Sequence, residues 1–214
     1  MTLQELTQLA SLGEGANLEF KRKVPRPERF AKEMIAFANT QGGRLLLGVD
    51  DDGAVVGLRD VEEEEFVLNR AMSRHCSPEL SFSMEHVPVA HRREVIIVHV
   101  PESPTKPHFL VQSENGSEGT AYVRVEDKSV EASPEAVKLM RKDKGTAGVS
   151  FEFGEKELML MRYLDNYGRI TVKQFASLAN ISDRGASRTL VLLTRANVLR
   201  LHADPRHDYF TLAY

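Results

Sequence analysis

The sequence has only one cysteine, no tryptophan and no long uninterrupted apolar run. With Cys76 alone, an intramolecular disulfide and a cysteine-rich zinc site are both excluded. No stretch of about 18 consecutive apolar residues occurs, so a transmembrane helix is not expected. The N-terminus, MTLQELTQLASLGEG, lacks the basic start and unbroken apolar core of a secretory signal. These absences predict a cytoplasmic protein that makes no membrane contact.

Two common enzyme signatures are also missing. The chain has no G-x-x-x-x-G-K-[ST] loop, so the sequence predicts no ATP site. Its seven histidines form neither an H-x-x-x-H nor an H-E-x-x-H pair, which argues against a zinc enzyme. Chemistry in this chain would therefore have to come from its carboxylates and its basic residues.

The length and charge of the chain leave nucleic-acid binding open. At 214 residues, it has the length of one average domain plus a small second one. The formal net charge of −3 is uneven: residues 1–150 carry 24 acidic and 19 basic side chains, and residues 151–214 carry 7 and 9. Because surface charge is screened over about 10 Å, a local basic patch on a mildly acidic protein can still bind a phosphate backbone.

The organisation of the chain predicts two domains. The polar, glycine-containing segment RKDKGTAGVS has no periodicity and is typical of a linker. We therefore expect a first domain over residues 1–142, a linker over 143–150 and a second domain over 151–214. In the first domain the helices and strands alternate without a βαβ rhythm, which predicts an α+β fold. The expected helices are 2–11, 27–41, 61–75 and 133–142, and the expected strands are 17–23, 80–88, 93–100, 108–111 and 121–125, with a hairpin over 44–58.

The second domain has the pattern of three helices followed by a β-hairpin. The helices are expected in EKELMLMRYLDNYG, TVKQFASLANI and SDRGASRTLVLLTRANVL, and the strands in LRLH and YFTLAY. This order is the layout of a winged helix-turn-helix domain.

The third of these helices is a candidate recognition helix. When its apolar positions face inward, the residues that fall mostly on its outer side are Arg184, Ser187, Arg188 and Arg195. Arginines on an exposed helix can contact phosphates or guanine edges, and the major groove of duplex DNA accepts one helix. The turn of the hairpin adds Arg206. The alternative is a solvated helix in a small packing or dimerisation module.

Two glutamates, Glu14 and Glu19, stand five residues apart before a run of positive charges. A phosphodiester-cleaving site that uses Mg²⁺ or Mn²⁺ needs two or three carboxylates, because hard cations prefer oxygen ligands and the metal lowers the pKa of an attacking water. Asp50 or Asp51 can supply a third ligand, and Lys21 shares the strand face of Glu19. The alternative is that Glu14 begins a strand and that the Asp-Asp-Gly sequence only forms a tight turn.

Longer motifs in the first domain match a known family. EGANLEFKRK, followed by IAFANTQGGRLLLGVDDDGAVVGL, resembles the Schlafen AlbA-type domain, whose signature is E-x-x-x-x-E-F-K, then A-F-A-N-T-x-G-G, then a G-V-D-D-x-G hairpin. The later segments KPHFL and GTAYVRVEDKSVEAS are similar to the closing part of that domain. The resemblance spans about residues 10–142. Many bacterial members add a winged helix and are described as transcriptional regulators.

The resemblance also implies a metal-dependent activity. In the animal Schlafen ribonucleases, three acidic residues of this domain form a metal-dependent site that cleaves structured RNA. By position, the resemblance carries them to Glu14, Glu19 and an aspartate of the Asp50-Asp51 pair, with Asp51 preferred. Those enzymes fold two such lobes into one clamp, whereas this sequence has a single lobe, so a homodimer would have to supply the second.

The leading prediction is a cytoplasmic, dimeric, DNA-binding transcriptional regulator that binds duplex DNA through its second domain. A further nucleic-acid contact is expected from the first domain, through Lys21, Arg22 and Lys23. One alternative is a metal-dependent nuclease, acting on RNA, that uses the three carboxylates with Mg²⁺ or Mn²⁺. The other alternative is an interaction module that binds no nucleic acid.

Overall fold

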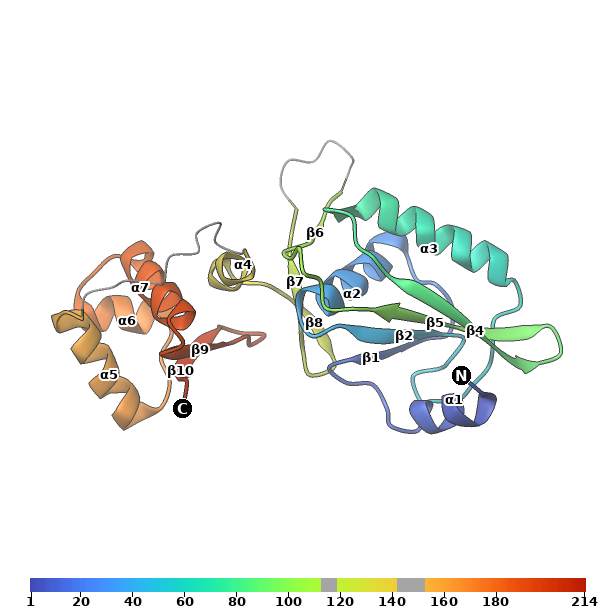
Figure 1. Cartoon of the computed structure of the whole chain (residues 1–214), viewed down its shortest axis with the longest axis horizontal. Coiled ribbons are helices and arrows are strands. Elements are labelled where there is room, and N and C mark those ends of the chain that lie inside the picture. The colour runs from blue at the N-terminus through green and yellow to red at the C-terminus, as the bar shows by residue number, and fades with distance from the viewer. Residues whose placement is uncertain (113–118, 142–152) are drawn as a thin grey trace. The chain divides into compact units, whose positions relative to one another are not determined.

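The computed structural model describes residues 1–112, 119–141 and 153–214, and these residues form two compact units (Figure 1). The first unit is Met1–Glu131 and the second is Ala132–Tyr214. The unit boundary falls before the helix that begins at Pro134, whereas the sequence pattern grouped this helix with the first domain. The predicted linker, 143–150, lies outside the described residues.

The first unit is built on a four-stranded mixed sheet in the order β1-β2-β5-β4. Its strands are β1 (Leu18–Lys21), β2 (Gly43–Leu47), β4 (Ser83–Ala90) and β5 (Arg93–Val100). β1 and β2 are parallel, and the helix α2 (Pro27–Asn39) connects them. This is a βαβ unit, which the sequence pattern did not predict. The predicted hairpin over 44–58 is reduced to one isolated bridge between Val49 and Val55, because β1 and β5 already pair with the two edges of β2.

Helices cover both faces of this sheet (Figure 1). On one face lie α2 and α3 (Val61–His75), and on the other lies α1 (Leu3–Ala10), whose N-cap is Thr2. Alternation along β2 sends Leu45 and Leu47 into the core under α2 and α3, and sends Leu46 into the core under α1. The sheet is therefore the middle layer of three, and the α+β fold class is confirmed.

Two short strand pairs complete the first unit. They are β3 (Cys76–Ser77) with β6 (Phe109–Leu110), and β7 (Tyr122–Val125) with β8 (Lys128–Glu131). The sequence predicted neither β3, which has only two residues, nor β8, whose sequence KSVE contains a single apolar residue. β7 packs against α2 and so brings Arg124 next to Glu19, the predicted site residue on β1.

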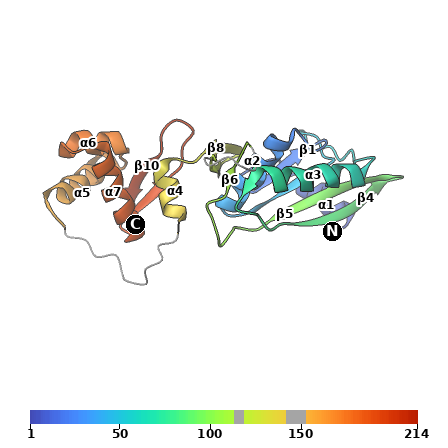
Figure 2. The same cartoon turned by 90° about the horizontal axis from the view of Figure 1, so that it is seen from above.

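The second unit contains four helices and a two-stranded hairpin within its described residues. They are α4 (Pro134–Met140), α5 (Glu155–Tyr167), α6 (Val172–Ala179), α7 (Asp183–Arg195), β9 (Leu199–His202) and β10 (Tyr209–Leu212). The order from α5 to β10 is the predicted one, and Thr171 and Ser182 are the N-caps of α6 and α7. Ile170 forms a β-bridge with Phe210, and both side chains are fully buried in the core of the unit. α4 packs against α7 (Figure 2).

None of the helices in the described ranges is long and apolar enough to cross a membrane.

Candidate nucleic-acid interface

Glu14 lies in the loop before β1 and folds back onto that strand. One oxygen of its carboxylate accepts a hydrogen bond from the backbone N–H of Phe20 at 2.8 Å. The same oxygen lies 3.6 Å from Nζ of Lys21. Lys21 in turn pairs with Glu19 and donates to the carbonyl of Phe20 at 2.6 Å. Glu14 and Lys21 thus join the loop before β1 to the end of that strand.

Glu19 is buried on the opposite face of β1 from Leu18 and Phe20, where it belongs to an ionic cluster formed by Glu19, Glu33 and Arg124. A guanidinium nitrogen of Arg124 lies 3.1 Å from Oε2 of Glu19, and another lies 2.9 Å from Oε2 of Glu33. Arg124 also donates to the carbonyl of Gly15 at 2.7 Å. Its side chain is only 1% exposed, so Arg124 joins β1, α2 and the loop before β1 from inside the molecule.

This Glu19–Glu33–Arg124 cluster is charged but incompletely hydrogen-bonded. Burial raises the pKa of the Glu19 carboxyl, and the hydrogen bond from Lys21 opposes that rise. The charges of Glu33 and Glu14 raise the pKa further. Oε2 of Glu19 and Nε of Arg124 have no hydrogen-bond partner among the described residues, so the 3.1 Å contact of Oε2 with Arg124 is an ion pair without hydrogen-bond alignment. The sequence pattern did not identify Arg124 as a partner of Glu19. The only sequence feature that could have indicated it is the single arginine within the predicted strand AYVRV.

Asp51 is exposed at the turn that follows Val49, and its neighbour Asp50 lies 3.7 Å from Arg22. Across residues 1–112, 119–141 and 153–214, no three His, Cys, Asp or Glu side chains are grouped to hold a metal ion. The carboxylates of Glu14 and Glu19 are instead occupied by a backbone amide, a lysine and an arginine. The side chains as they are arranged do not fit Mg²⁺ or Mn²⁺ ligation, and we derive no catalytic step from them.

The basic run at the end of β1 divides into one half-buried and two exposed residues. Lys21 is engaged by the two glutamates, so its charge is neutralised locally. The side chain of Arg22 is 70% exposed, and Lys23 is also exposed. Of the three cations predicted to bind nucleic acid in this unit, Arg22 and Lys23 are therefore the two available to a phosphate backbone.

On α7, the predicted contact residues fall into two pairs. Arg184 and Arg188 are exposed and one helical turn apart. Ser187, in contrast, is only 4% exposed, because α4 packs over it. Its hydroxyl donates to Glu135 and accepts from Nζ of Lys138 at 2.8 Å.

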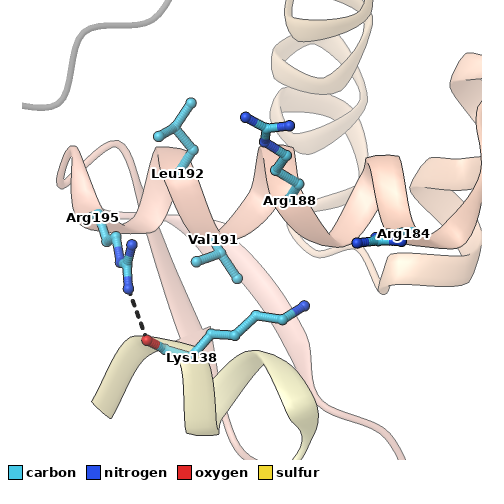
Figure 3. A pocket seen from close by; sticks show the side chains of 6 residues that line it. All are labelled: Lys138, Arg184, Arg188, Val191, Leu192 and Arg195. Carbon is cyan, nitrogen blue, oxygen red and sulfur yellow. Dashed lines mark hydrogen bonds between the residues drawn. The ribbon is translucent and has the colours of Figure 1, made fainter. Parts of the chain in front are cut away.

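Arg195 also contacts α4. Its guanidinium donates to the backbone carbonyl of Lys138 at 2.9 Å, at the C-terminal end of α4 (Figure 3). A second hydrogen bond, at 3.4 Å, reaches the carbonyl of Arg141. This is a favourable location for a cation, because the last carbonyls of a helix lack intrahelical donors. The helical period alone placed Ser187 and Arg195 outside, since it does not reveal that a helix about 50 residues earlier packs on that face.

The turn between β9 and β10 presents Arg206 to solvent. The carboxylate of Asp204 accepts hydrogen bonds from the backbone amides of Arg206 and His207, at 2.8 and 3.4 Å. The bond from Arg206 is the main reason that the pKa of Asp204 is lowered. The turn is thus ordered by its own aspartate, and the exposed Arg206 lies where the sequence predicted it.

The two units differ in charge. Residues 1–131 carry 22 acidic and 15 basic side chains, a formal charge of −7, and residues 132–214 carry 9 and 13, a formal charge of +4. The acidic excess of the whole chain therefore comes from the first unit. The second unit has the sign that attracts a phosphate backbone.

Comparisons with known proteins give two similar solved structures and one family match. The chain is similar to the N-terminal domain of a RecG-related protein from Nitrosomonas europaea, with 29% identity and a TM-score of 0.44 over 58% of this chain and 89% of that one. It is also similar to a Corynebacterium diphtheriae protein, with 15% identity and a TM-score of 0.45 over 99% of this chain and 38% of that one. The profile of the Schlafen, AlbA_2 family matches residues 14–133, which is more than half of the chain. This chain therefore belongs to the Schlafen AlbA_2 family.

Proposed function

We propose that this protein is a cytoplasmic, DNA-binding transcriptional regulator whose second unit is a winged helix-turn-helix domain. The observation that carries the proposal is the pair Arg184 and Arg188, which are exposed one turn apart on α7 in a unit with a formal charge of +4. Membership of the Schlafen AlbA_2 family supports a role that involves nucleic acid.

The arrangement of the second unit supports α7 as the recognition helix. α6 and α7 are separated by three residues and are capped by Thr171 and Ser182, as in a helix-turn-helix. The bridge between Ile170 and Phe210 ties the β9–β10 hairpin to the turn before α6, which is where a wing attaches. Arg184 and Arg188 can then contact phosphates or guanine edges, and Arg206 can contact the backbone beside them.

The first unit plays a smaller part in this binding. Its charge of −7 repels a phosphate backbone, and Lys21 is neutralised by Glu14 and Glu19. Arg22 and Lys23 are exposed and can add a secondary contact. We propose that this unit also supplies the surface of a homodimer, as the single lobe implies, so that two α7 helices meet two half-sites on duplex DNA.

The experiment that tests the proposal is fluorescence anisotropy with a labelled, mixed-sequence DNA duplex at low salt. Replacing Arg184 and Arg188 by alanine is expected to weaken binding about 100-fold, from roughly 1–2 kcal/mol per arginine contact. The matched control replaces Lys156 and Arg162 by alanine, two exposed cations on α5 of the same unit. Equal losses in the two double variants would show that only net charge matters and would refute the assignment to α7.

A further inference from the structure

A cleft of about 520 Å³ lies at the contact of α4 with α7 (Figure 3). Its lining residues are Lys138, Arg184, Arg188, Val191, Leu192 and Arg195. Lys138 comes from α4 and the other five come from α7. In Figure 3 the side chain of Lys138 runs along α7 beneath Val191, while Arg188 and Leu192 project on the side away from α4.

The charged side chains that line this cleft are all positive. Four of the six lining side chains are cations, the other two are aliphatic, and none is acidic. Arg184 and Arg188 are four residues apart on one helix, where like charges repel. Outside the lining, Glu135 forms an ion pair with Lys138 at 3.8 Å, and the same carboxylate oxygen accepts the hydroxyl hydrogen of Ser187. An anion in the cleft would relieve this repulsion.

The size and lining of the cleft indicate the kind of anion. A volume of about 520 Å³ falls within the range of about 300–1,000 Å³ that is usual for small-molecule sites. Guanidinium groups match the oxygens of a phosphate in pairs, and lysine adds a point charge. Val191 and Leu192 offer an apolar wall to an uncharged ring. We propose that the α4–α7 cleft binds a small organic phosphate of nucleotide size.

Such a ligand would join α4 to α7, because Lys138 and the arginines contribute to the same site from two helices. α4 is already attached by hydrogen bonds of Ser133 with Asp208, of Glu135 and Lys138 with Ser187, and of the Lys138 and Arg141 carbonyls with Arg195. A bound anion adds a further link and therefore favours the arrangement in which α4 covers part of α7.

The consequence for DNA binding rests on the proposed function. A ligand in the cleft contacts Arg184 and Arg188, which are the two arginines assigned to the duplex, so ligand and duplex compete for them. The organic phosphate is thus an antagonist of DNA binding.

The binding site is tested by isothermal titration calorimetry on the full chain with AMP, GMP, CMP and UMP, each compared with its uncharged nucleoside. At least one mononucleotide is expected to bind, and its nucleoside is not. Lys138→Met is expected to weaken that binding about tenfold, because it removes the charge and keeps the aliphatic stem. Ser187 keeps Glu135 as a partner in this variant, and circular dichroism checks that the fold is unchanged. Lys156→Met, on α5, is the matched control and should bind normally.

Failure to bind any of the four mononucleotides would overturn the proposal. Equal affinity in Lys138→Met and the wild type would overturn it as well. The antagonism is tested separately, by adding the mononucleotide to the anisotropy assay, where it should weaken duplex binding by the wild type more than by Lys138→Met. If calorimetry shows binding and duplex affinity does not change, the antagonism is refuted while the site stands. If no duplex binds to any variant, the proposed function fails and the calorimetry still decides the site.

Discussion

Replacing Arg124 by methionine should destabilise the first unit strongly, because Arg124 is the buried partner of two carboxylates. Its side chain is 1% exposed, and those of Glu19 and Glu33 are 8% and 13% exposed. Removing one member of a buried ion pair leaves an uncompensated charge and costs about 3–5 kcal/mol. Glu19 keeps Lys21 and Glu33 keeps the hydroxyl of Ser129, so we expect the lower end, about 3 kcal/mol.

The pH dependence of that loss is a second part of the same prediction. Burial has already raised the pKa of Glu19 above its ordinary value of 4.5, and removing Arg124 raises it further. Between the ordinary pKa and the raised one, the folded state binds more protons than the unfolded state, so stability falls as the pH rises. The destabilisation by Arg124→Met is therefore smaller at pH 5 than at pH 7.

Urea unfolding at pH 5 and pH 7 measures both effects, with hydrogen exchange of the α2 amides assigning the transition of the first unit. Glu19→Gln combined with Arg124→Met should cost less than the sum of the two single variants by at least about 1 kcal/mol, because the charges are coupled. A loss below about 1 kcal/mol, or an equal loss at both pH values, would refute the reasoning. Such a result would leave Glu19 available for another role, including the metal ligation that the family resemblance implies.

Three further predictions concern other parts of the chain. Arg22→Ala with Lys23→Ala should weaken duplex binding about fivefold, because the two exposed charge contacts together contribute roughly 1 kcal/mol. A loss as large as that of the α7 double variant would show that the main contact lies in the first unit. Gly42→Ala should lower the free energy of unfolding of the first unit by at least about 2 kcal/mol, because φ of Gly42 is +76° and the new Cβ would lie 2.6 Å from the carbonyl oxygen of Val100. Urea unfolding measures this loss, and an unchanged midpoint of the urea transition would contradict it. Light scattering should give twice the mass of one chain, and a monomer at micromolar concentration would exclude the proposed dimer.

Local signals in the sequence predicted most of the helices of this fold. α3 occupies the predicted residues, and Thr2, Ser133 and Ser182, the first residues of three predicted helical segments, are N-caps in the structure. These features are readable because an N-cap and a helical period depend on residues within a few positions of each other. The βαβ connection was missed because parallel pairing of β1 with β2 joins residues 26 positions apart, which no local pattern records.

The same distinction explains the candidate sites. The exposure of Arg184 and Arg188 follows from the helical period and is seen in the structure. The partners of Glu19 and Ser187 do not follow from it, because Arg124 is 105 positions after Glu19 and Lys138 is 49 positions before Ser187. Spacing alone therefore describes Glu19 as one of a set of carboxylates, whereas packing makes it one side of a buried ion pair.

The salt dependence of duplex affinity tests the central claim most directly, because it counts the phosphate contacts made by α7. For each phosphate contact that is lost, the slope of log K against log salt concentration becomes shallower by about 0.9. If Arg184 and Arg188 both contact the backbone, the slope for the double alanine variant will be shallower than the wild-type slope by about 1.8. The Lys156 and Arg162 control should keep the wild-type slope. An unchanged slope together with an unchanged affinity in the α7 variant would contradict the account.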